Sequence, residues 1–572
     1  MRAAETDDNV GAAGTTQRHL GAKLCKDALR RQAVEFCLQT GMHGYKYIAQ
    51  PGKHGVERVF WVVAVAVSMV AAVWTMLFAY DFNQSHRTLL AVDTTHHPLW
   101  RVHVPAVTVC PSNKVLRSRA AQLISAMRLP DGVTEEDALQ DMAKLVEIIL
   151  PRAVNTSNLE RLQAILDANK MSVDQVMWMV SPSCDELLVK CRWKRKLCSR
   201  CSDLFRKVRT SYGYCCSFNY LDREQDTIKT RTHAGGCVGT APGSVQRLSA
   251  CGSADGLSMA VYVQPSNYFA SIVPSYSVMV LLHSALQFPD ESAHTKVIGT
   301  GTISLISYVA EVTEATDRLR RSLDPRERKC LFSDETYLPM YRNFTFGNCM
   351  ASCKANMTME VCGCFPITFP HVLNRKLCNL LDVPCQAALF SPTWPVGRKP
   401  LNVTSCPRCK ATCEHVQYIV KSSTGGLNWT TDPGNYFVSG MSDRNASEYA
   451  IVHVYARRSI TTRNKMDRHL LTEDLLGSLG GLSGLFVGFS LVAGFECVYF
   501  FTIRPCFRTQ RGINTASSTP WNSKSSEEKA HQRSPAGRIS PFVLVPPRIL
   551  ALRADAVGRR RPPRPFKATV GQ

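Results

Sequence analysis

The sequence predicts a membrane protein in which two transmembrane helices flank a large, disulfide-rich α+β ectodomain. Three observations predict this fold class: two strongly apolar segments, the placement of the glycosylation sequons, and the placement of the cysteines. They divide the chain into a cytosolic N-terminus at 1–58, a first span at 59–80, an extracellular domain at 81–472, a second span at 473–503, and a cytosolic tail at 504–572.

The first apolar segment runs from Val59 to Tyr80 and contains no charged residue. A helix of roughly 20 apolar residues is long enough to cross the hydrocarbon core of a bilayer. The segment is too long and too far from Met1 to be a cleaved signal peptide. We therefore expect a retained signal-anchor helix, with Arg58 on its cytosolic side.

The residues between the two apolar segments carry the marks of an oxidising, extracellular compartment. Every N-x-[ST] sequon lies there, and none lies in either tail. Nineteen of the 23 cysteines also lie there, which predicts an ectodomain held by disulfides. The glycosylation candidates are Asn83, Asn155, Asn343, Asn356, Asn402, Asn428 and Asn445. The disulfide candidates are Cys110, Cys184, Cys191, Cys198, Cys201, Cys215, Cys216, Cys237, Cys251, Cys330, Cys349, Cys353, Cys362, Cys364, Cys378, Cys385, Cys406, Cys409 and Cys413.

Two cysteine motifs have an alternative interpretation. Cys198-x-x-Cys201 and Cys406-x-x-Cys409 each resemble half of a zinc ribbon. Thiols in a glycosylated segment are normally oxidised, so disulfides are favoured and no metal site is expected. Because nineteen is an odd number, at least one thiol is free or pairs between chains. Cys25, Cys37, Cys497 and Cys506 lie outside this region.

The formal net charge of +22 reflects membrane topology rather than nucleic-acid binding. The tail after Ile503 holds fourteen Lys/Arg against three Asp/Glu, and the N-terminal residues are also basic. Both termini thus obey the positive-inside rule. The basic tail can contact anionic membrane lipids. It also contains Arg559, Pro562 and Pro565, an R-x-x-P-x-x-P pattern that an SH3 domain could bind, although such patterns are common in tails of this composition.

The ectodomain alternates strand-like and helix-like stretches. We expect strands near 103–110, 275–285, 302–312 and 446–456, and helical periodicity over 116–207. Short helices and Cys-Pro turns are expected over 330–415. No Ser/His/Asp trio, catalytic carboxylate pair or phosphate-binding glycine loop is visible, so we expect neither an enzyme nor a cofactor.

The second apolar segment, from about Leu475 to Ile503, is unusual for a membrane anchor. Its glycines recur at helical spacing and share one face, and Glu496 would cost roughly 2.5–3.5 kcal/mol at mid-membrane. Such a stripe packs helices closely together, and helices packed around an axis also form a pore. The residues alone support a pore and an anchor about equally. The glycines are Gly477, Gly480, Gly481, Gly484 and Gly488.

The same segment, with its G-G-x-x-G-L-F-x-G-x-S pattern followed by Glu496, resembles the second membrane helix of the degenerin/epithelial sodium channel superfamily. Further motifs follow in family order from 36 to 500. His43-Gly44 matches the family's gating motif, and Val104 to Cys110 matches its F-P-A-V-T-x-C element with Val for Phe. The element from Thr210 to Asn219 contains vicinal cysteines, which favour the arthropod pickpocket branch. The thumb signature is matched by Cys349, Cys353, Cys362, Cys364, Cys406, Cys409, Cys413 and Tyr418.

The resemblance implies a trimer at the plasma membrane with a finger, thumb, palm, knuckle and β-ball ectodomain and a sodium-preferring, amiloride-sensitive pore. By position, Gly488-Phe489-Ser490 would form the selectivity constriction, and Gly477 would be the small residue beside the gate. His43-Gly44 would line the inner pore, and Glu496 would lie at the inner mouth. Partner subunits would come from the same family.

One position departs from the family pattern. The family commonly has a second serine three residues after the first, and this chain has Ala493 there, which puts the selectivity in doubt. A non-conducting accessory or receptor-like subunit stays open as an alternative, and an ATP-gated channel of the same topology is disfavoured by the thumb pattern. The sequence does not specify the activating stimulus.

Overall fold

The computed structural model describes residues 29–151, 157–221, 245–370, 375–390, 406–429, 437–438, 440–441, 444–469, 472–505 and 507. The chain divides into two compact units, residues 1–494 and 495–572. Several predicted features lie outside the described residues: Asn155, Asn402, Cys25, Cys237, Cys506, Arg559, Pro562 and Pro565.

A single long helix, α3 (Gly55–Ser85), contains the first predicted span. Of the described residues, it is the one unbroken helix long and apolar enough to cross a membrane. Its apolar side chains point mostly outward, as shown by Trp74, which is 74% exposed. Thr75 donates its hydroxyl to the carbonyl of Ala71 at 2.8 Å, so this polar group is satisfied within the helix.

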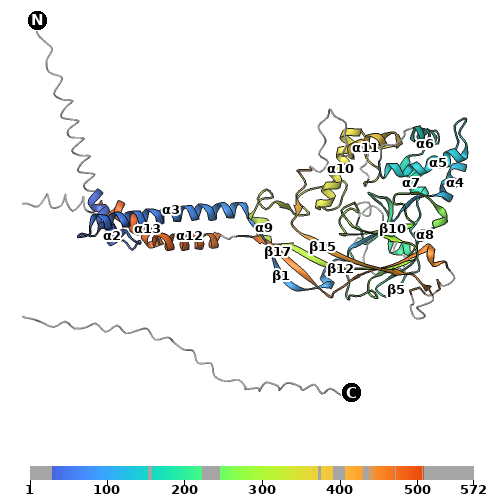
Figure 1. Ribbon diagram of the computed structural model, residues 1–572. Coiled ribbons are helices and arrows are strands. Elements are labelled where there is room, and N and C mark those ends of the chain that lie inside the picture. The colour runs from blue at the N-terminus through green and yellow to red at the C-terminus, as the bar shows by residue number, and fades with distance from the viewer. Residues whose placement is uncertain are drawn as a thin grey trace, which may run out of the picture. The chain divides into compact units, whose positions relative to one another are not determined.

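The ectodomain is built on a mixed eight-stranded sheet (Figure 1). Strand β12 lies at its centre and pairs in parallel with β16 and then with β17, while β15 pairs antiparallel along its full length. In sheet order the strands are β1 (Thr88–Pro98), β17 (Ile460–Arg468), β12 (Thr302–Ala315), β16 (Tyr449–Ala456), β8 (Leu257–Tyr262), β4 (Leu188–Trp193) and β5 (Lys196–Leu197), with β15 (His415–Gly426) beside β12.

A second, five-stranded sheet shares a hydrophobic core with the first. Its inner strands are buried on both faces, since β2 and β10 have no exposed residue, which explains their continuous apolar sequences. In sheet order its strands are β11 (His294–Gly299), β10 (Ser277–His283), β2 (Ala106–Pro111), β7 (Gly213–Phe218) and β6 (Phe205–Thr210). Two further pairs are β3 (Asn113–Leu116) with β9 (Tyr268–Ser271), and β13 (Cys330–Leu331) with β14 (Ala411–Thr412).

The helical part of the ectodomain has its own core around Leu145, Leu162 and Val176. Capping boxes begin α5 at Thr134, α7 at Ser172 and α8 at Ser183. The helices are α4 (Arg117–Ser125), α5 (Glu135–Met142), α6 (Ser157–Ala168), α7 (Val173–Val180), α8 (Cys184–Leu187), α9 (Asp317–Ser322), α10 (Phe346–Cys362) and α11 (Val383–Phe390).

The expectation of helix up to residue 207 is wrong after Leu187. Residues 188–193 form β4 and residues 205–210 form β6 instead. The disulfide Cys191–Cys201 joins β4 to the segment between these two strands, and β4 pairs with the buried strand β8. Tertiary pairing therefore overrides the local helical pattern.

Disulfides join distant segments as the cysteine distribution predicted. The vicinal pair Cys215-Cys216 binds two different partners, because successive residues of β7 point to opposite faces of the sheet. Both C-x-x-C motifs are oxidised, Cys198 included. The bonds in which both cysteines are described are Cys110–Cys215, Cys184–Cys216, Cys191–Cys201, Cys330–Cys413, Cys349–Cys409, Cys353–Cys406, Cys362–Cys385 and Cys364–Cys378.

The prediction that Cys251 forms a disulfide is wrong, because Cys251 is an exposed free thiol. This agrees with the odd number of ectodomain cysteines. The sequons differ in exposure: Asn356, Asn428 and Asn445 are exposed, whereas Asn83 in α3 and Asn343 are partly buried.

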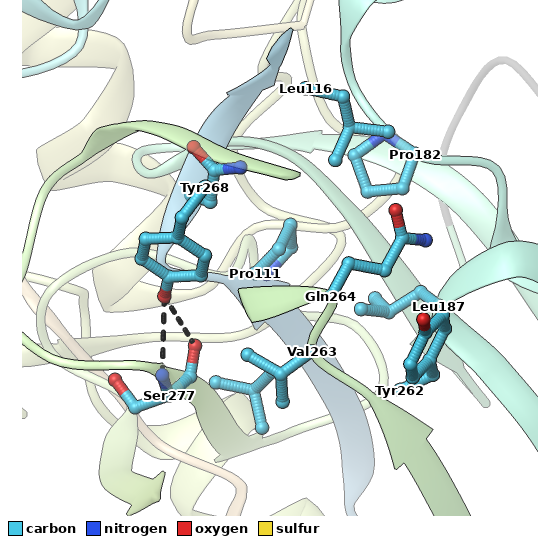
Figure 2. Close-up of a pocket in the computed structure, with 11 residues that line it drawn as sticks. Pro111, Leu116, Pro182, Leu187, Tyr262, Val263, Gln264, Tyr268 and Ser277 are labelled. Atoms are coloured by element: carbon cyan, nitrogen blue, oxygen red, sulfur yellow. Dashed lines mark hydrogen bonds between the residues drawn. The ribbon is translucent and has the colours of Figure 1, made fainter. Parts of the chain in front are cut away.

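The junction between the sheet pair β3–β9 and strand β10 is tightly packed. A cavity of about 10 Å³ lies there, and Figure 2 shows residues that line it, such as Pro111 and Gln264. The hydroxyl of Tyr268 lies 3.1 Å from the backbone nitrogen of Ser277 and 3.2 Å from its carbonyl oxygen. A cavity of this size holds at most about one water molecule, so it serves packing rather than ligand binding.

Lys114 in β3 is the least expected residue of this junction. Its side chain is fully buried, and its Nζ has no hydrogen-bond partner among the described residues. Burial lowers the pKa of Lys114 from 10.5 to about 7. An unpaired buried ammonium is costly, so Lys114 destabilises the folded ectodomain near neutral pH.

Replacing Lys114 with Met should therefore stabilise the protein by about 1–4 kcal/mol at pH 7. The pKa of Lys114 is lower in the folded than in the unfolded protein, so the unfolded chain binds more protons between pH 7 and 10.5, and wild-type stability rises with pH there. The advantage of Lys114→Met should shrink accordingly, by at most about 1.4 kcal/mol per pH unit. Thermal unfolding of the purified protein at pH 7 and pH 9 measures both effects.

The exposed Lys421 in β15 provides the control, since Lys421→Met should change neither stability nor its pH dependence. A Lys114→Met protein that is less stable than wild type at pH 7, with an unchanged pH dependence, would contradict this account.

Candidate functional site

The second apolar segment forms two helices with a break between them. Helix α12 (Thr472–Val487) ends before Gly488, and α13 begins at Leu491 and runs to Val498. At this break the path of the chain bends by 68°. The three residues of the break, Gly488, Phe489 and Ser490, are those that the sequence predicted as a constriction.

Gly488 accounts for the position of the break. Its φ of +69° lies in the left-handed region, which side chains disfavour. Its N–H still donates to the carbonyl of Gly484 at 2.9 Å, and Phe489 donates to the carbonyl of Ser483 at 3.3 Å. Both bonds close α12, as is typical of a helix that ends on a left-handed glycine.

Ser490 begins the next helix. Its hydroxyl accepts a hydrogen bond from the N–H of Ala493 at 3.2 Å, and its carbonyl accepts one from Gly494 at 3.1 Å. This is the geometry of an N-cap, for which serine is a preferred residue. Ala493, the departure from the family pattern, is buried and offers only its backbone to this turn.

The structure brings the His43-Gly44 motif to the same break, although more than 440 positions separate them in the sequence. The N–H of His43 donates to the carbonyl of Val487 at 3.0 Å, which satisfies a carbonyl left free at the end of α12. A Cβ atom on Gly488 would lie 2.8 Å from two ring carbons of His43. Gly488 is therefore required both by its φ angle and by the closeness of His43.

The remaining glycines of α12 lie on a free surface. Gly477, Gly480 and Gly481 are exposed, and a Cβ atom on any of them would meet nothing within 4 Å. Helix α12 runs side by side with α3 (Figure 1). Packing among the described residues thus does not require glycine at Gly477, Gly480 or Gly481. A Cβ atom on Gly484, the next glycine of the stripe, would lie 4.0 Å from the carbonyl oxygen of Phe489.

Glu496 belongs to the second compact unit and lies in α13. One of its carboxylate oxygens is buried and has no hydrogen-bond partner among the described residues. A buried carboxylate oxygen without a partner is costly, so Glu496 is a candidate for contact with water or an ion.

The ectodomain contains a separate cavity of about 1070 Å³. Its lining comes from the loop between β10 and β11, the start of α10, and strand β15. The lining carries four carboxylates, Asp290, Glu291, Glu314 and Glu414, of which Glu291 pairs with Lys354 at 3.4 Å. Burial raises the pKa of Asp290. The hydroxyl of Ser292 donates to the carboxylate of Asp290 at 2.5 Å, so these two polar groups of the lining satisfy each other.

Sequence reasoning missed the two aromatic residues beside the His43-Gly44 motif. Tyr47 and Trp61 stack with their ring centroids 4.5 Å apart. The available signal was the position of Trp61, which lies with Phe60 in the first turns of the apolar span, soon after Tyr45 and Tyr47.

Comparison with known proteins supports the assignment made from the motifs. Residues 36–500 match the family described as amiloride-sensitive sodium channel. Sodium channel protein Nach of Drosophila melanogaster is 24% identical over 83% of this chain and 88% of its own length. Pickpocket protein 28 of the same organism is 24% identical over 84% of this chain and 79% of its own length. The bile acid-sensitive ion channel of Mus musculus is 24% identical over 86% of this chain and 92% of its own length.

These matches cover the membrane helix α3, the disulfide-bonded ectodomain and the helix break together. They agree with the order of the motifs and with the vicinal cysteines that favoured the pickpocket branch. The chain therefore belongs to the degenerin/epithelial sodium channel superfamily, in its pickpocket-like branch.

Proposed function

We propose that this chain is one subunit of a gated, sodium-preferring, amiloride-sensitive cation channel of the plasma membrane, through which sodium moves passively. The observation that carries the proposal is the helix break at Gly488-Phe489-Ser490. His43 stabilises this break through its hydrogen bond to Val487. Residues 473–503 then form the second span, and both termini are cytosolic. The permeant ion is sodium, and the channel needs no cofactor.

A trimer would supply neighbours for the exposed glycines of α12. Three copies of α12 related by three-fold rotation would place their glycine stripes around a common axis. Because Gly477, Gly480 and Gly481 meet nothing within the chain, these positions are free to approach neighbouring subunits. The family relationship supports partner subunits of the same family, as a homotrimer or a heterotrimer.

The break has the chemistry of an ion constriction. A left-handed glycine turns the backbone out of its helical path, so carbonyl groups near it can point toward the axis. Three such turns, with the hydroxyls of Ser490, would replace part of the water shell of a sodium ion. Glu496 would then mark the inner mouth, where a carboxylate attracts cations.

A non-conducting accessory or receptor-like subunit is the second candidate function. In that case the glycines would only pack helices, and the cavity of about 1070 Å³ would be the functional part of the protein. The spacing of the glycines does not separate the two functions, but substitutions at Gly477 and Ser490 do.

Replacing Gly477 with Val should hold the channel open and produce a sustained, amiloride-sensitive sodium current in expressing cells. The added side chain enters space that is open within the chain but lies beside the neighbouring subunits of a trimer, so the closed packing is disfavoured. Whole-cell current, with and without co-expressed family members, measures this. Gly299→Val in β11 is the matched control, since this position is also open but lies in the ectodomain. Absence of amiloride-sensitive current from Gly477→Val protein at the cell surface, in every combination, would count against a conducting subunit.

Replacing Ser490 with Ala should lower the sodium-to-potassium permeability ratio. The variant loses the hydroxyl and also the cap on Ala493, which is typically worth about 1 kcal/mol of helix stability. Ser490→Thr keeps a hydroxyl and should retain most of the selectivity. Reversal potentials in sodium and potassium solutions give the ratio.

Ser483 is the control for this experiment, because its hydroxyl bonds to the carbonyl of Gly480 inside α12 and only its backbone contacts the break. If Ser490→Ala and Ser483→Ala both leave the permeability ratio unchanged, Ser490 has only a packing role.

A further inference from the structure

Residues 43–54 fold back along the start of α3 instead of extending away from it. The short helix α2 (Tyr45–Ala49) lies beside α3 (Figure 1). The ring of Tyr47 stacks on that of Trp61, with a centroid distance of 4.5 Å and an interplanar angle of 24°. One face of Trp61 is therefore covered by the segment that follows the His43-Gly44 motif.

Gly44 approaches the same surface of α3. Its φ is +84°, and a Cβ atom on it would lie 2.7 Å from Cγ2 of Val65 and 3.7 Å from Cε3 of Trp61. Trp61 thus lies next to both Gly44 and Tyr47. These two contacts fix where His43 can lie, because His43 is bonded directly to Gly44.

Polar contacts close the turn between α2 and α3. Lys53 forms an ion pair with Glu57, and the guanidinium of Arg58 donates to the carbonyl of Gln50 at 3.1 Å. The ammonium of Lys53 also lies 5.8 Å from the centre of the Tyr47 ring. The fold of this turn is therefore specified at several points, with the stacked rings at its centre.

The far end of this series of contacts is the helix break. His43 donates its N–H to Val487, and its ring lies against Gly488. Contacts therefore run without interruption from Trp61 through Gly44 and His43 to the backbone of the break. The indole itself has no contact with Gly488 in this series, so any effect of Trp61 on the break must act through His43 and Gly44.

We infer that Trp61 is a positioning residue for the ion constriction. Its ring holds Gly44 and Tyr47 so that the His43 backbone stays bonded to Val487, and this keeps the break at Gly488 in one conformation. This inference rests on the proposed function, in which the break is the constriction. In this inference Trp61 acts on the break through Gly44 and His43.

Trp74 is the matched control in the same helix. It lies further along α3 and is 74% exposed. It therefore represents a tryptophan whose ring faces lipid and packs little within the chain. The variants to compare are Trp61→Ala, Trp61→Phe and Trp74→Ala. Phenylalanine keeps an aromatic face for Tyr47 and should preserve most of the effect.

The first readout does not depend on conduction. Cysteines at His43 and Val487 are introduced into full-length protein whose Cys25, Cys37, Cys497 and Cys506 are Ser, and mild oxidation then cross-links them. Cleavage at a protease site introduced into the ectodomain separates the two parts of the chain on a gel, unless the cross-link joins them. We expect Trp61→Ala to lose most of the cross-linked product, whereas Trp61→Phe and Trp74→Ala keep it. Equal cross-linking in Trp61→Ala and Trp74→Ala would overturn the inference.

The second readout is the sodium-to-potassium permeability ratio of the same variants without the added cysteines. It should fall toward one in Trp61→Ala and stay at the wild-type value in Trp74→Ala. A lost cross-link with an unchanged ratio would overturn the link to the constriction. If no variant and no wild-type protein conducts, the proposed function fails, and the cross-link alone still decides whether Trp61 positions His43.

Discussion

The arrangement of the membrane-associated segments depends on one close contact, that between the backbone of His43 and the end of α12. At this point Val487 receives a hydrogen bond from outside its own helix, and Gly488 turns into the left-handed region. A helix interrupted within a membrane must satisfy its freed backbone groups by other means, because lipid offers no hydrogen bonds. His43 supplies one such partner, and the hydroxyl of Ser490 supplies another. The break is thus a specified feature of the fold, stabilised from two sides.

The same contact connects segments that are remote in the sequence. Its supports come from the residues before α3, from the start of α3 itself, and from the end of α12. The ectodomain between α3 and α12 is rigid for different reasons: two sheets with a common core, and disulfides that join strands and helices far apart in the chain. Strands β1 and β17, which pair with each other, follow α3 and precede α12 directly. One strand pair therefore connects the ectodomain to both α3 and α12.

The sequence predicted the architecture well where a strong physical pattern exists. The uncharged run at 59–80 lies within a single helix, and the apolar strands around residues 106–111, 277–283 and 449–456 follow the expected runs. The cysteine distribution predicted an oxidised ectodomain, but it could not give the connectivity, which depends on which strand faces meet. Residues 188–207 were wrongly expected to be helical, because pairing with β8 is a tertiary effect that local periodicity does not report. For the candidate site, spacing identified Gly488 and Ser490, whereas the contact with His43 and the stack of Tyr47 on Trp61 join distant segments and appear only in three dimensions.

The central claim is that Ser490 faces the path of the ion at a three-fold constriction. Cadmium block of a Ser490→Cys channel tests it most directly, because three thiolates close to a common axis bind a soft divalent cation tightly. Ser483→Cys, which lies in α12 before the break, is the comparison. The account predicts that external cadmium blocks the current of Ser490→Cys and spares that of Ser483→Cys. A Ser490→Cys channel that conducts normally and is insensitive to cadmium would contradict it.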